Sequence, residues 1–366
     1  MGEIGWKEKG VDLSSGLLRT LPAEAAHDFG LHFLRNGYQR YLPAHEYNPK
    51  VDMRSTVSGI GSFDHPIGLA AGFDKNAVAL PALFDLGFAF VEAGTVTPRP
   101  QAGNPKPRLF RVKDQHSIIN RMGFNNHGLD VVCKRFKSFK NTHPGKCLGI
   151  NLGKNKDTPN DLATEDYLKG FGKFIEIADY FVINISSPNT PGLRELASAD
   201  FIYKLSEGLS RIIQNESAKK SYKGPKDFSS IFIKIDPDLP KKEFQTLIET
   251  VAKENFGGII LTNTHRVETP EAGGLSGSPI ASMSTARLEW AYEVHQGALE
   301  MVAVGGIFSG TDVIERVIRG AGLVQIYSSF IYRGPRVVLK IMEEIEAEVR
   351  LRGAEKLSDL QYQYYI

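Results

Sequence analysis

The amino-acid sequence predicts an α/β protein, and specifically a (β/α)8 barrel of the TIM type. From Pro66 onward, short apolar runs rich in β-branched residues alternate with amphipathic helical patterns, which is typical of a parallel sheet. Eight such runs match the strand count of a closed barrel. The runs are 66–71, 88–94, 147–152, 180–186, 231–236, 257–262, 301–305 and 323–327. The helical patterns are 77–86, 166–178, 200–214, 241–255, 284–295, 311–319 and 336–350.

A closed barrel is favoured over a doubly wound open sheet. An open sheet of that kind would need a G-x-G-x-x-G turn after its first strand, and residues 70–75 read A-A-G-F-D-K instead. Residues 95–146 are too long for an ordinary loop between a strand and a helix. Their start, residues 98–107, is rich in proline and glycine, which predicts an elaborated lid over the barrel mouth rather than a second domain.

The bulk composition excludes several classes of protein. The 44 basic and 42 acidic side chains nearly cancel, so no nucleic-acid partner is expected. Cys133 and Cys147 have neither metal-ligand nor disulfide-framework spacing, and no metal site is expected. No apolar stretch approaches the roughly 18 residues of a membrane span, and residues 1–7 lack the apolar core of a signal peptide. The chain as given is expected to be soluble, and a removed leader is left open.

Two short helical patterns precede the barrel, at about 13–19 and 23–36. The second carries apolar side chains at helical spacing, which form one broad apolar face. This face either packs against the main domain or meets a lipid or a lipophilic ligand, and the local sequence favours neither. The expected organisation is a small N-terminal helical hairpin, residues 1–45, followed by a barrel domain, residues 46–366.

Most of the predicted strands lead to polar side chains. This matters because barrel enzymes carry their catalytic groups at the carboxyl ends of the strands. Each polar side chain has an ordinary explanation, such as turn capping or a solvated charge, but together they are costly to bury without a ligand. They predict a polar, mostly neutral pocket that suits a heterocycle with several carbonyl and N–H edges. The residues are Lys75, Thr95, Asn151, Asn184, Ser187, Lys234, Thr262, Asn263, Thr264, Tyr327 and Ser328.

The last two strand ends predict a phosphate site. The glycine pair 305–306 and residues 327–328 follow the seventh and eighth runs, where barrels commonly hold a phosphate through backbone N–H groups. With Lys234 near the barrel centre, the pattern suggests a mononucleotide such as FMN, because a cation near the flavin ring stabilises its anionic reduced form. The alternative is an aldolase-type barrel in which Lys234 or Lys75 forms a Schiff base. Borohydride trapping with substrate distinguishes the two.

The segment N-I-S-S-P-N-T at 184–190 is the most specific local feature. No histidine with a partner carboxylate is evident near Ser187, so an acyl-transfer triad is disfavoured. The pKa of a serine hydroxyl lies far above neutrality, so Ser187 can act as a general base only in concert with hydride loss or through a relay. Thr190 is close enough in sequence to join such a relay. Capping of a turn by Ser186 and Ser187 is the alternative.

Seven motifs along the chain are long enough to identify a family. They are G-L-A-A-G-F-D-K at 68–75, G-T-V-T-P at 94–98, G-N-P-K-P-R at 103–108, I-N-R-M-G-F-N at 119–125, N-L-G-K-N-K at 151–156, N-I-S-S-P-N-T at 184–190 and G-G-L-S-G at 273–277. In this order they resemble the dihydroorotate dehydrogenases of the membrane-associated, quinone-reducing class (class 2). The resemblance extends from about residue 13 to residue 339.

The resemblance implies a reaction and a role for Ser187. The reaction is oxidation of (S)-dihydroorotate to orotate with FMN as hydride acceptor, followed by reoxidation of the flavin by ubiquinone, in pyrimidine (UMP) biosynthesis. Ser187 matches the base that takes the C5 proton while hydride leaves C6 for flavin N5, and Thr190 and Phe124 match its relay neighbours. The soluble class has a cysteine as base, so a serine at this position favours the quinone-linked class.

The resemblance also implies three sets of binding residues. Orotate is expected to contact Lys75, Asn120, Met122, Gly123, Phe124, Asn184, Asn189, Asn263 and Thr264. FMN is expected to contact Ala70, Ala71, Gly94, Thr95, Asn151, Asn184, Lys234, Thr262, Ser276, Gly277, Gly305, Gly306, Tyr327 and Ser328. A quinone tunnel is expected along His27, Phe29, Phe33, Phe73, Arg111 and Tyr327.

For the N-terminal hairpin, the resemblance implies the mouth of a quinone tunnel lying on a membrane surface. The expected location is the mitochondrial inner membrane, with a bacterial inner membrane as the alternative, and a monomer is expected. One departure from the family bears on the site: Asp236 replaces an alanine after Lys234. If this carboxylate points inward, it would weaken the electrostatic help that Lys234 gives to the flavin.

Overall fold

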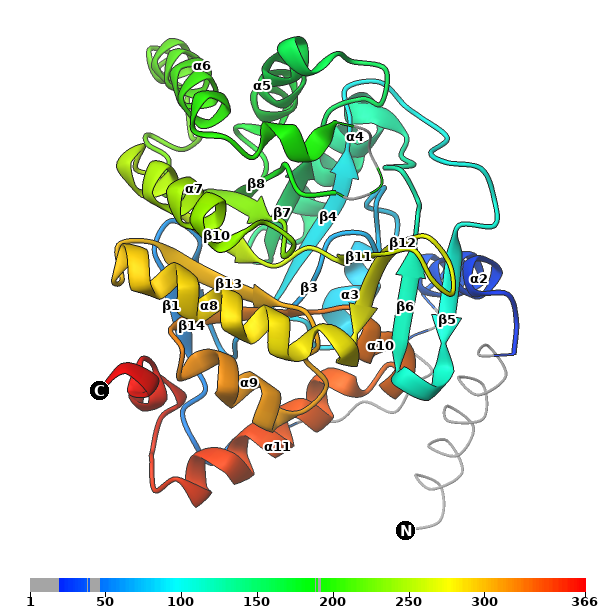
Figure 1. Ribbon diagram of the computed structural model, residues 1–366, viewed down its shortest axis with the longest axis vertical. Coiled ribbons are helices and arrows are strands. Elements are labelled where there is room, and N and C mark those ends of the chain that lie inside the picture. Colours follow the sequence, from blue (N-terminus) through cyan, green and yellow to red (C-terminus); the bar gives the residue numbers. More distant parts are fainter. Residues whose placement is uncertain (1–19, 38, 40–46, 188, 190–191) are drawn as a thin grey trace.

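The computed structural model describes residues 20–37, 39, 47–187, 189 and 192–366, and its centre is a closed barrel of eight parallel strands (Figure 1). In order around the barrel, the strands are β10 (Gly258–Leu261), β13 (Glu300–Val304), β14 (Ala321–Ile326), β3 (Ile67–Leu69), β4 (Phe90–Val96), β7 (Cys147–Leu152), β8 (Tyr180–Asn184) and β9 (Ile231–Ile235). The eight predicted runs all form barrel strands, so the predicted fold class is confirmed, with differences only near the strand ends.

Helices surround the barrel on its outer side (Figure 1). Those at the predicted positions are α3 (Leu80–Asp85), α5 (Ala163–Phe174), α6 (Ala199–Ser217), α7 (Lys241–Lys253), α8 (Ala281–His295), α9 (Gly310–Val317) and α11 (Val337–Leu351). Two further helices, α4 (Gly128–Thr142) and α10 (Ser328–Arg333), were not predicted. In α4, apolar side chains recur every three or four residues and are buried against the barrel, so this helix fills the place between β4 and β7.

The predicted lid, residues 95–146, has more internal structure than its sequence indicated. It contains α4 and a hairpin of β5 (Leu109–Val112) and β6 (Ser117–Asn120). With β11 (His265–Val267) and β12 (Gly273–Gly277), this hairpin forms a four-stranded antiparallel sheet in the order β11-β12-β6-β5. A second hairpin, β1 (Ser55–Val57) with β2 (Gly61–Phe63), packs beside β14. The lid is therefore a small sheet rather than an irregular loop.

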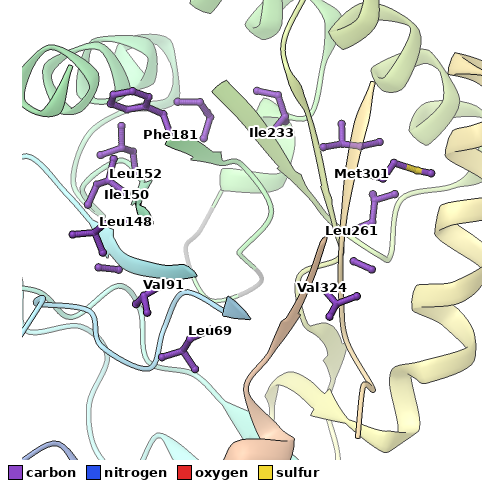
Figure 2. Packing of buried hydrophobic residues seen from close by; sticks show 14 of the residues in the cluster. Leu69, Val91, Leu148, Ile150, Leu152, Phe181, Ile233, Leu261, Met301 and Val324 are labelled. Carbon is purple, nitrogen blue, oxygen red and sulfur yellow. The ribbon is translucent and has the colours of Figure 1, made fainter. Parts of the chain in front are cut away.

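Side chains alternate between the inside and the outside of the barrel, as the period of two in a strand requires. Figure 2 shows part of the outer set, in which Val91, Leu148, Phe181, Ile233 and Val324 belong to the large core cluster between the strands and the helices. The inner residues of the same strands form a separate cluster. It includes Phe90, Tyr180, Val182, Phe232, Ile260, Val302 and Leu323.

Glycines make room for large rings inside the barrel. Gly149 pairs with Tyr180, and a Cβ atom on Gly149 would lie 2.1 Å from the Tyr180 ring. A Cβ atom on Gly68 would likewise lie 2.3 Å from the Phe90 ring. The Phe90 and Tyr180 rings pack edge to face with centroids 6.2 Å apart. These rings close the amino-terminal half of the barrel.

Of the predicted N-terminal hairpin, the structure describes the second helix, α2 (Ala23–Arg35), which packs against β5 and α3 (Figure 1). The predicted helix at 13–19 lies outside the described residues. Glu24 on α2 forms an ion pair with Arg108 at 2.9 Å, whereas Phe29 remains 54% exposed. Across the described residues, no helix is both long and apolar enough to cross a membrane.

We expect Gly149→Ala to destabilise the protein by about 1–3 kcal/mol, because the added methyl group forces the Tyr180 ring out of its place in a packed core. Denaturant unfolding measures the change. Gly172→Ala on α5 is the matched control, since a Cβ atom there meets nothing within 4 Å and alanine favours a helix. Equal stability changes in the two variants would contradict this account of the barrel interior.

Candidate active site

A cavity opens at the carboxyl ends of the barrel strands, with an empty volume of about 1070 Å³ that includes space open to solvent. Every residue expected to bind orotate lines this cavity, and so does Ser187. The residues expected to bind FMN that line it are Ala70, Ala71, Thr95, Asn184, Lys234, Thr262, Ser276, Gly277, Gly305, Gly306, Tyr327 and Ser328. The fold thus gathers most of the predicted site around one space.

Two of the expected FMN contacts lie behind the cavity wall. Asn151 is fully buried and hydrogen-bonds to Thr95 and Asn184, which themselves line the cavity. Gly94 lies where β4 approaches β7, and a Cβ atom on it would lie 2.5 Å from the Asn151 carbonyl oxygen. Both residues therefore support the wall from behind. Thr190 lies outside the described residues.

Asn184, the last residue of β8, is the centre of a network of amides. Its Nδ2 donates to Thr95 Oγ1 and to Asn151 Oδ1, each at 3.1 Å. Its Oδ1 accepts from Ser186 Oγ at 3.1 Å and from Asn263 Nδ2 at 3.4 Å. Because donors and acceptors on both sides are paired, the amide orientation is defined before any ligand arrives.

Ser187 lies in the turn after β8 with its side chain at the cavity, and 5% of the residue is exposed. Its Oγ accepts a hydrogen bond from the Asn189 backbone N–H at 3.3 Å, so the hydroxyl also caps the turn. Asn189 Nδ2 in turn donates to Asn120 Oδ1 at 3.2 Å. Within the described residues, Ser187 hydrogen-bonds to no histidine or carboxylate. This arrangement gives no support to an acyl-transfer triad.

Lys75 brings a positive charge to the cavity from the segment after β3. Its Nζ donates to the Gly72 carbonyl oxygen at 2.7 Å. Burial is the main cause that lowers the pKa of Lys75, to about 8; the charge of Arg108 contributes to this shift, and the carboxylates of Glu24 and Asp74 partly offset it. The ammonium form therefore predominates at neutral pH. Such a group suits the carboxylate of a small anionic ligand.

Lys234 points from β9 into the cavity and is almost completely buried. Burial lowers the pKa of Lys234, and the negative charge of Glu92 opposes this shift. In the part of the chain that the structure describes, the ammonium has no hydrogen-bond or ion-pair partner. A buried cation of this kind needs an electron-rich ligand beside it. The buried carboxylate of Asp236, two residues after Lys234, raises the pKa of the Arg287 guanidinium.

One part of the cavity lining is built from glycines and small hydroxyls. Gly277, Gly305 and Gly306 have positive φ values of 98°, 117° and 70°. A Cβ atom on Gly306 would lie 2.4 Å from Ala281 Cα, so no side chain can be added there. The hydroxyls of Ser276 and Ser328 lie 3.0 Å apart. Bare backbone and serine hydroxyls form the kind of surface that receives a phosphate.

A row of rings leads from the cavity towards α2. Tyr327 lines the cavity, and its ring lies 6.0 Å from that of Phe73, which lies 5.2 Å from that of His27. Burial, together with the charge of Lys75, lowers the pKa of His27 to about 3. Of the other expected tunnel residues, Phe33 packs against the core and Arg111 donates to the Leu21 carbonyl oxygen. Neither they nor the exposed Phe29 reach the cavity wall.

Several cavity residues were not predicted from the sequence. The alternation of inward- and outward-facing residues along β14 could have identified Gln325. The run 323–327 was interpreted only as a buried strand. The residues from the lid could not be found without knowing that β5 and β6 cover the barrel mouth. The unpredicted lining residues are Gly72, Leu109, Ile118, Ile280, Val304, Ile307, Phe308, Gln325, Ile326 and Ser329. Across the described residues, no group of three or more His, Cys, Asp or Glu side chains could hold a metal ion.

The fold and the cavity define a class, that of (β/α)8-barrel enzymes with the site at the carboxyl ends of the strands. The family model for dihydroorotate dehydrogenase matches residues 53–349. The chain therefore belongs to the dihydroorotate dehydrogenase family.

Relatives of this chain carry the name of the quinone-dependent class. A dihydroorotate dehydrogenase (quinone) from Stenotrophomonas maltophilia (strain K279a) is 41% identical over 352 residues, which cover 93% of this chain and 98% of the relative. The mitochondrial dihydroorotate dehydrogenase (quinone) of Mus musculus is 38% identical, with coverage of 95% and 88%. The crystal structure of the Eimeria tenella enzyme in complex with ferulenol superposes with a TM-score of 0.86 at 36% identity and covers 94% of this chain and 98% of that chain.

We expect His27 to make the stability of the protein depend on acid pH. Its pKa is about 3 in the folded chain and about 6.5 when unfolded, so the unfolded state takes up a proton first as the pH falls through 6.5. Between pH 7 and pH 5.5 this costs about 1 kcal/mol of stability, a loss that His27→Gln removes. Urea unfolding at the two pH values measures it. His32→Gln, at an exposed position on the same helix, should keep the loss.

Proposed function

We propose that this chain oxidises (S)-dihydroorotate to orotate and passes the electrons to a quinone such as ubiquinone, in pyrimidine (UMP) biosynthesis. The observation that carries the proposal is the cavity itself. It combines Ser187, the cation of Lys75 and a set of oriented amides in a family whose relatives bear this activity in their names. A serine rather than a cysteine at 187 supports a quinone over a soluble acceptor.

The residues around the cavity fit FMN as the bound cofactor. Gly277, Gly305, Gly306 and Ser328 would hold its phosphate, and the buried ammonium of Lys234 would lie at the electron-rich edge of its ring system. When bound, FMN supplies an acceptor for a hydride and a donor of electrons to a quinone. Thr95, Thr262 and Ser276, with Ala70, Ala71, Asn184 and Tyr327, would complete its surroundings, with Gly94 and Asn151 behind them.

The amides match the edges of orotate. The ring of orotate presents two carbonyl groups and two N–H groups, so asparagine side chains can satisfy both kinds of edge. Asn120, Asn184, Asn189 and Asn263 would pair with the ring, and Lys75 would bind its carboxylate. Met122, Gly123, Phe124 and Thr264 would complete the pocket.

Ser187 Oγ would take the proton from C5 of dihydroorotate. A serine hydroxyl is too weak a base to hold that proton alone at neutral pH, so the transfer must coincide with loss of the hydride from C6 or be followed at once by passage to a relay. Phe124 and Thr190 are proposed as the neighbours of Ser187 in this relay. Phe124 also helps to exclude water from the reacting atoms, because its ring lies at the cavity wall and is almost completely buried.

The N-terminal segment, residues 1–45, is proposed as the quinone entrance, and residues 46–366 as the catalytic barrel. Tyr327, Phe73 and His27 form an aromatic path towards α2, and the exposed Phe29 gives α2 an apolar outer surface. Phe33 and Arg111 are proposed to line the mouth of this path. We propose that α2 rests on a membrane surface, either the mitochondrial inner membrane or a bacterial inner membrane, and that the enzyme is a monomer.

The proposed function predicts that the purified protein is yellow and that dihydroorotate bleaches it in the absence of oxygen, because the hydride reduces the bound flavin. A later addition of quinone should restore the colour. Absorbance near the flavin band measures both steps. A protein that does not bleach would overturn the proposal, and an aldolase-type enzyme would instead be inactivated by borohydride in the presence of its substrate.

We expect Ser187→Ala to slow flavin reduction by dihydroorotate by roughly two to four orders of magnitude, since general-base catalysis contributes about that much. FMN should remain bound, because the substitution removes only a hydroxyl from the turn. Anaerobic stopped-flow absorbance measures the rate. Ser230→Ala, a buried serine that precedes β9 and does not line the cavity, serves as the control and should reduce at the wild-type rate. Near-normal reduction in Ser187→Ala would remove this residue from its role.

A further inference from the structure

Glu92 on β4 is a carboxylate buried inside the barrel, which so far has been described only through its effect on the pKa of Lys234. The alternation along β4 turns it inward, and it is fully buried. Its Oε1 accepts from Asn151 Nδ2 at 2.7 Å. Its Oε2 accepts from Gln325 Nε2 at 2.5 Å and from the Tyr180 hydroxyl at 3.5 Å. Glu92 therefore connects β4, β7, β8 and β14 beneath the cavity.

The charge of Glu92 decides which way the Asn151 amide faces. The oxygen and nitrogen ends of an amide have nearly the same size and differ only in accepting or donating, whereas an ionised carboxylate only accepts. Asn151 must therefore turn its Nδ2 to Glu92 and its Oδ1 to the cavity side. That Oδ1 accepts from Thr95 Oγ1 at 2.5 Å and from Asn184 Nδ2 at 3.1 Å.

The same direction passes on to the cavity wall. Because Asn184 donates its Nδ2 to Asn151, its Oδ1 must face the other way, where it accepts from Asn263 Nδ2 at 3.4 Å and from Ser186 Oγ at 3.1 Å. A reversed Asn151 would place two N–H donors against each other at Asn184. Glu92 thus orients Asn151 at one end of the network. At the other end, the backbone N–H groups of Ser186 and Thr264 donate to Asn184 Oδ1 at 3.3 Å and to Asn263 Oδ1 at 2.8 Å and hold these two cavity-lining amides in the same direction.

Glu92 is also the negative charge that acts on Lys234. The strand register places Lys234 beside Asn184 on the neighbouring strand, so both face the barrel interior. Within the described residues no ion pair joins Glu92 to a cation, and the two charges act on each other through the buried interior. Screening is weak in such an environment, so each charge stabilises the other in the absence of a ligand.

We propose that Glu92 is a positioning residue, which orients Asn151, supports through it the donor and acceptor pattern that Asn184 and Asn263 present to the substrate, and supplies the counter-charge of Lys234. Glu92 does not line the cavity. The inference rests on the proposed function, because it names the residue that aligns the orotate-binding amides and adjusts the charge beside the flavin.

Glu92→Gln tests the proposal in the FMN-loaded enzyme, because it keeps the size of the side chain and removes the charge. The new Nε2 can donate either to Gln325, which then turns its otherwise unpartnered Oε1 towards position 92, or to Asn151, which then turns its Oδ1 there. Position 92 therefore no longer fixes the direction of the Asn151 amide. We expect the dissociation constant of orotate to rise at least tenfold. We also expect the flavin midpoint potential to become more positive, because the charge of Lys234 is no longer compensated. A tenfold change in the two-electron equilibrium corresponds to about 30 mV.

Two further variants separate positioning from packing. Tyr180→Phe removes only the longest hydrogen bond of Glu92 and should change the orotate affinity less than twofold. The double variant Glu92→Gln with Gln325→Glu exchanges these two hydrogen-bonded side chains, so the carboxylate lies at 325 and the amide at 92. The new amide at 92 then donates to the carboxylate at 325 and accepts from Asn151 Nδ2, so the amide direction and most of the orotate affinity should return.

The outcomes are distinct. Unchanged orotate affinity and flavin potential in Glu92→Gln would overturn the proposal, and so would a folded double variant that binds orotate no better than the single one. If Glu92→Gln does not fold, the double variant decides: orotate affinity within threefold of wild type supports the proposal, and a tenfold loss overturns it. A wild-type protein that binds neither FMN nor orotate would instead refute the proposed function itself.

Discussion

The rest of the site depends on the strand register of a closed barrel. Because eight parallel strands are hydrogen-bonded in a ring, the residue that faces inward on one strand fixes which residues face inward on its neighbours. The register pairs Asn184 with Lys234, and both point into the interior. A slip of one residue along β9 would turn Lys234 out among the helices and bring Ile233 into the cavity. Burial of the apolar residues on the outer face fixes this register, and the register in turn places the polar residues on the inner face.

The inner face is divided along the barrel axis. The rings of Phe90 and Tyr180 fill the amino-terminal half, where glycines on adjacent strands leave space for them. Polar residues begin further along the same strands, with Glu92 directly after Phe90 on the inner face of β4 and Asn184 after Tyr180 and Val182 on that of β8. The aromatic layer excludes water from below, so the interaction between the charges above it is less screened than it would be in water. Each strand thus contributes core residues in its amino-terminal half and polar site residues in its carboxyl-terminal half.

The sequence was sufficient for features that depend on local pattern. The eight apolar runs and most helices follow from periodicity, and the polar strand ends led directly to Lys75, Asn184 and Lys234. Features that depend on pairing between distant segments were missed. Residues 117–120 and 273–277 form adjacent strands of the lid sheet, a contact that no local pattern encodes. Glu92 was missed because a single charge in an apolar run gives no sign that three strands will supply it with hydrogen bonds.

The ion pair between Glu24 and Arg108 connects α2 to the lid and, through it, to the turn that carries Ser187. The same guanidinium donates to the carbonyl oxygens of Ala102 and Asn104, and Asn104 Nδ2 donates to the carbonyl oxygen of Asn189 at 3.4 Å. Arg108 is almost completely buried, so without Glu24 its charge would lack its carboxylate partner in the core of the lid. α2 and the turn that carries Ser187 are thus linked by a continuous series of contacts through Arg108 and Asn104. A substitution at Glu24 in α2 is therefore expected to affect the cavity as well as the outer surface of the helix.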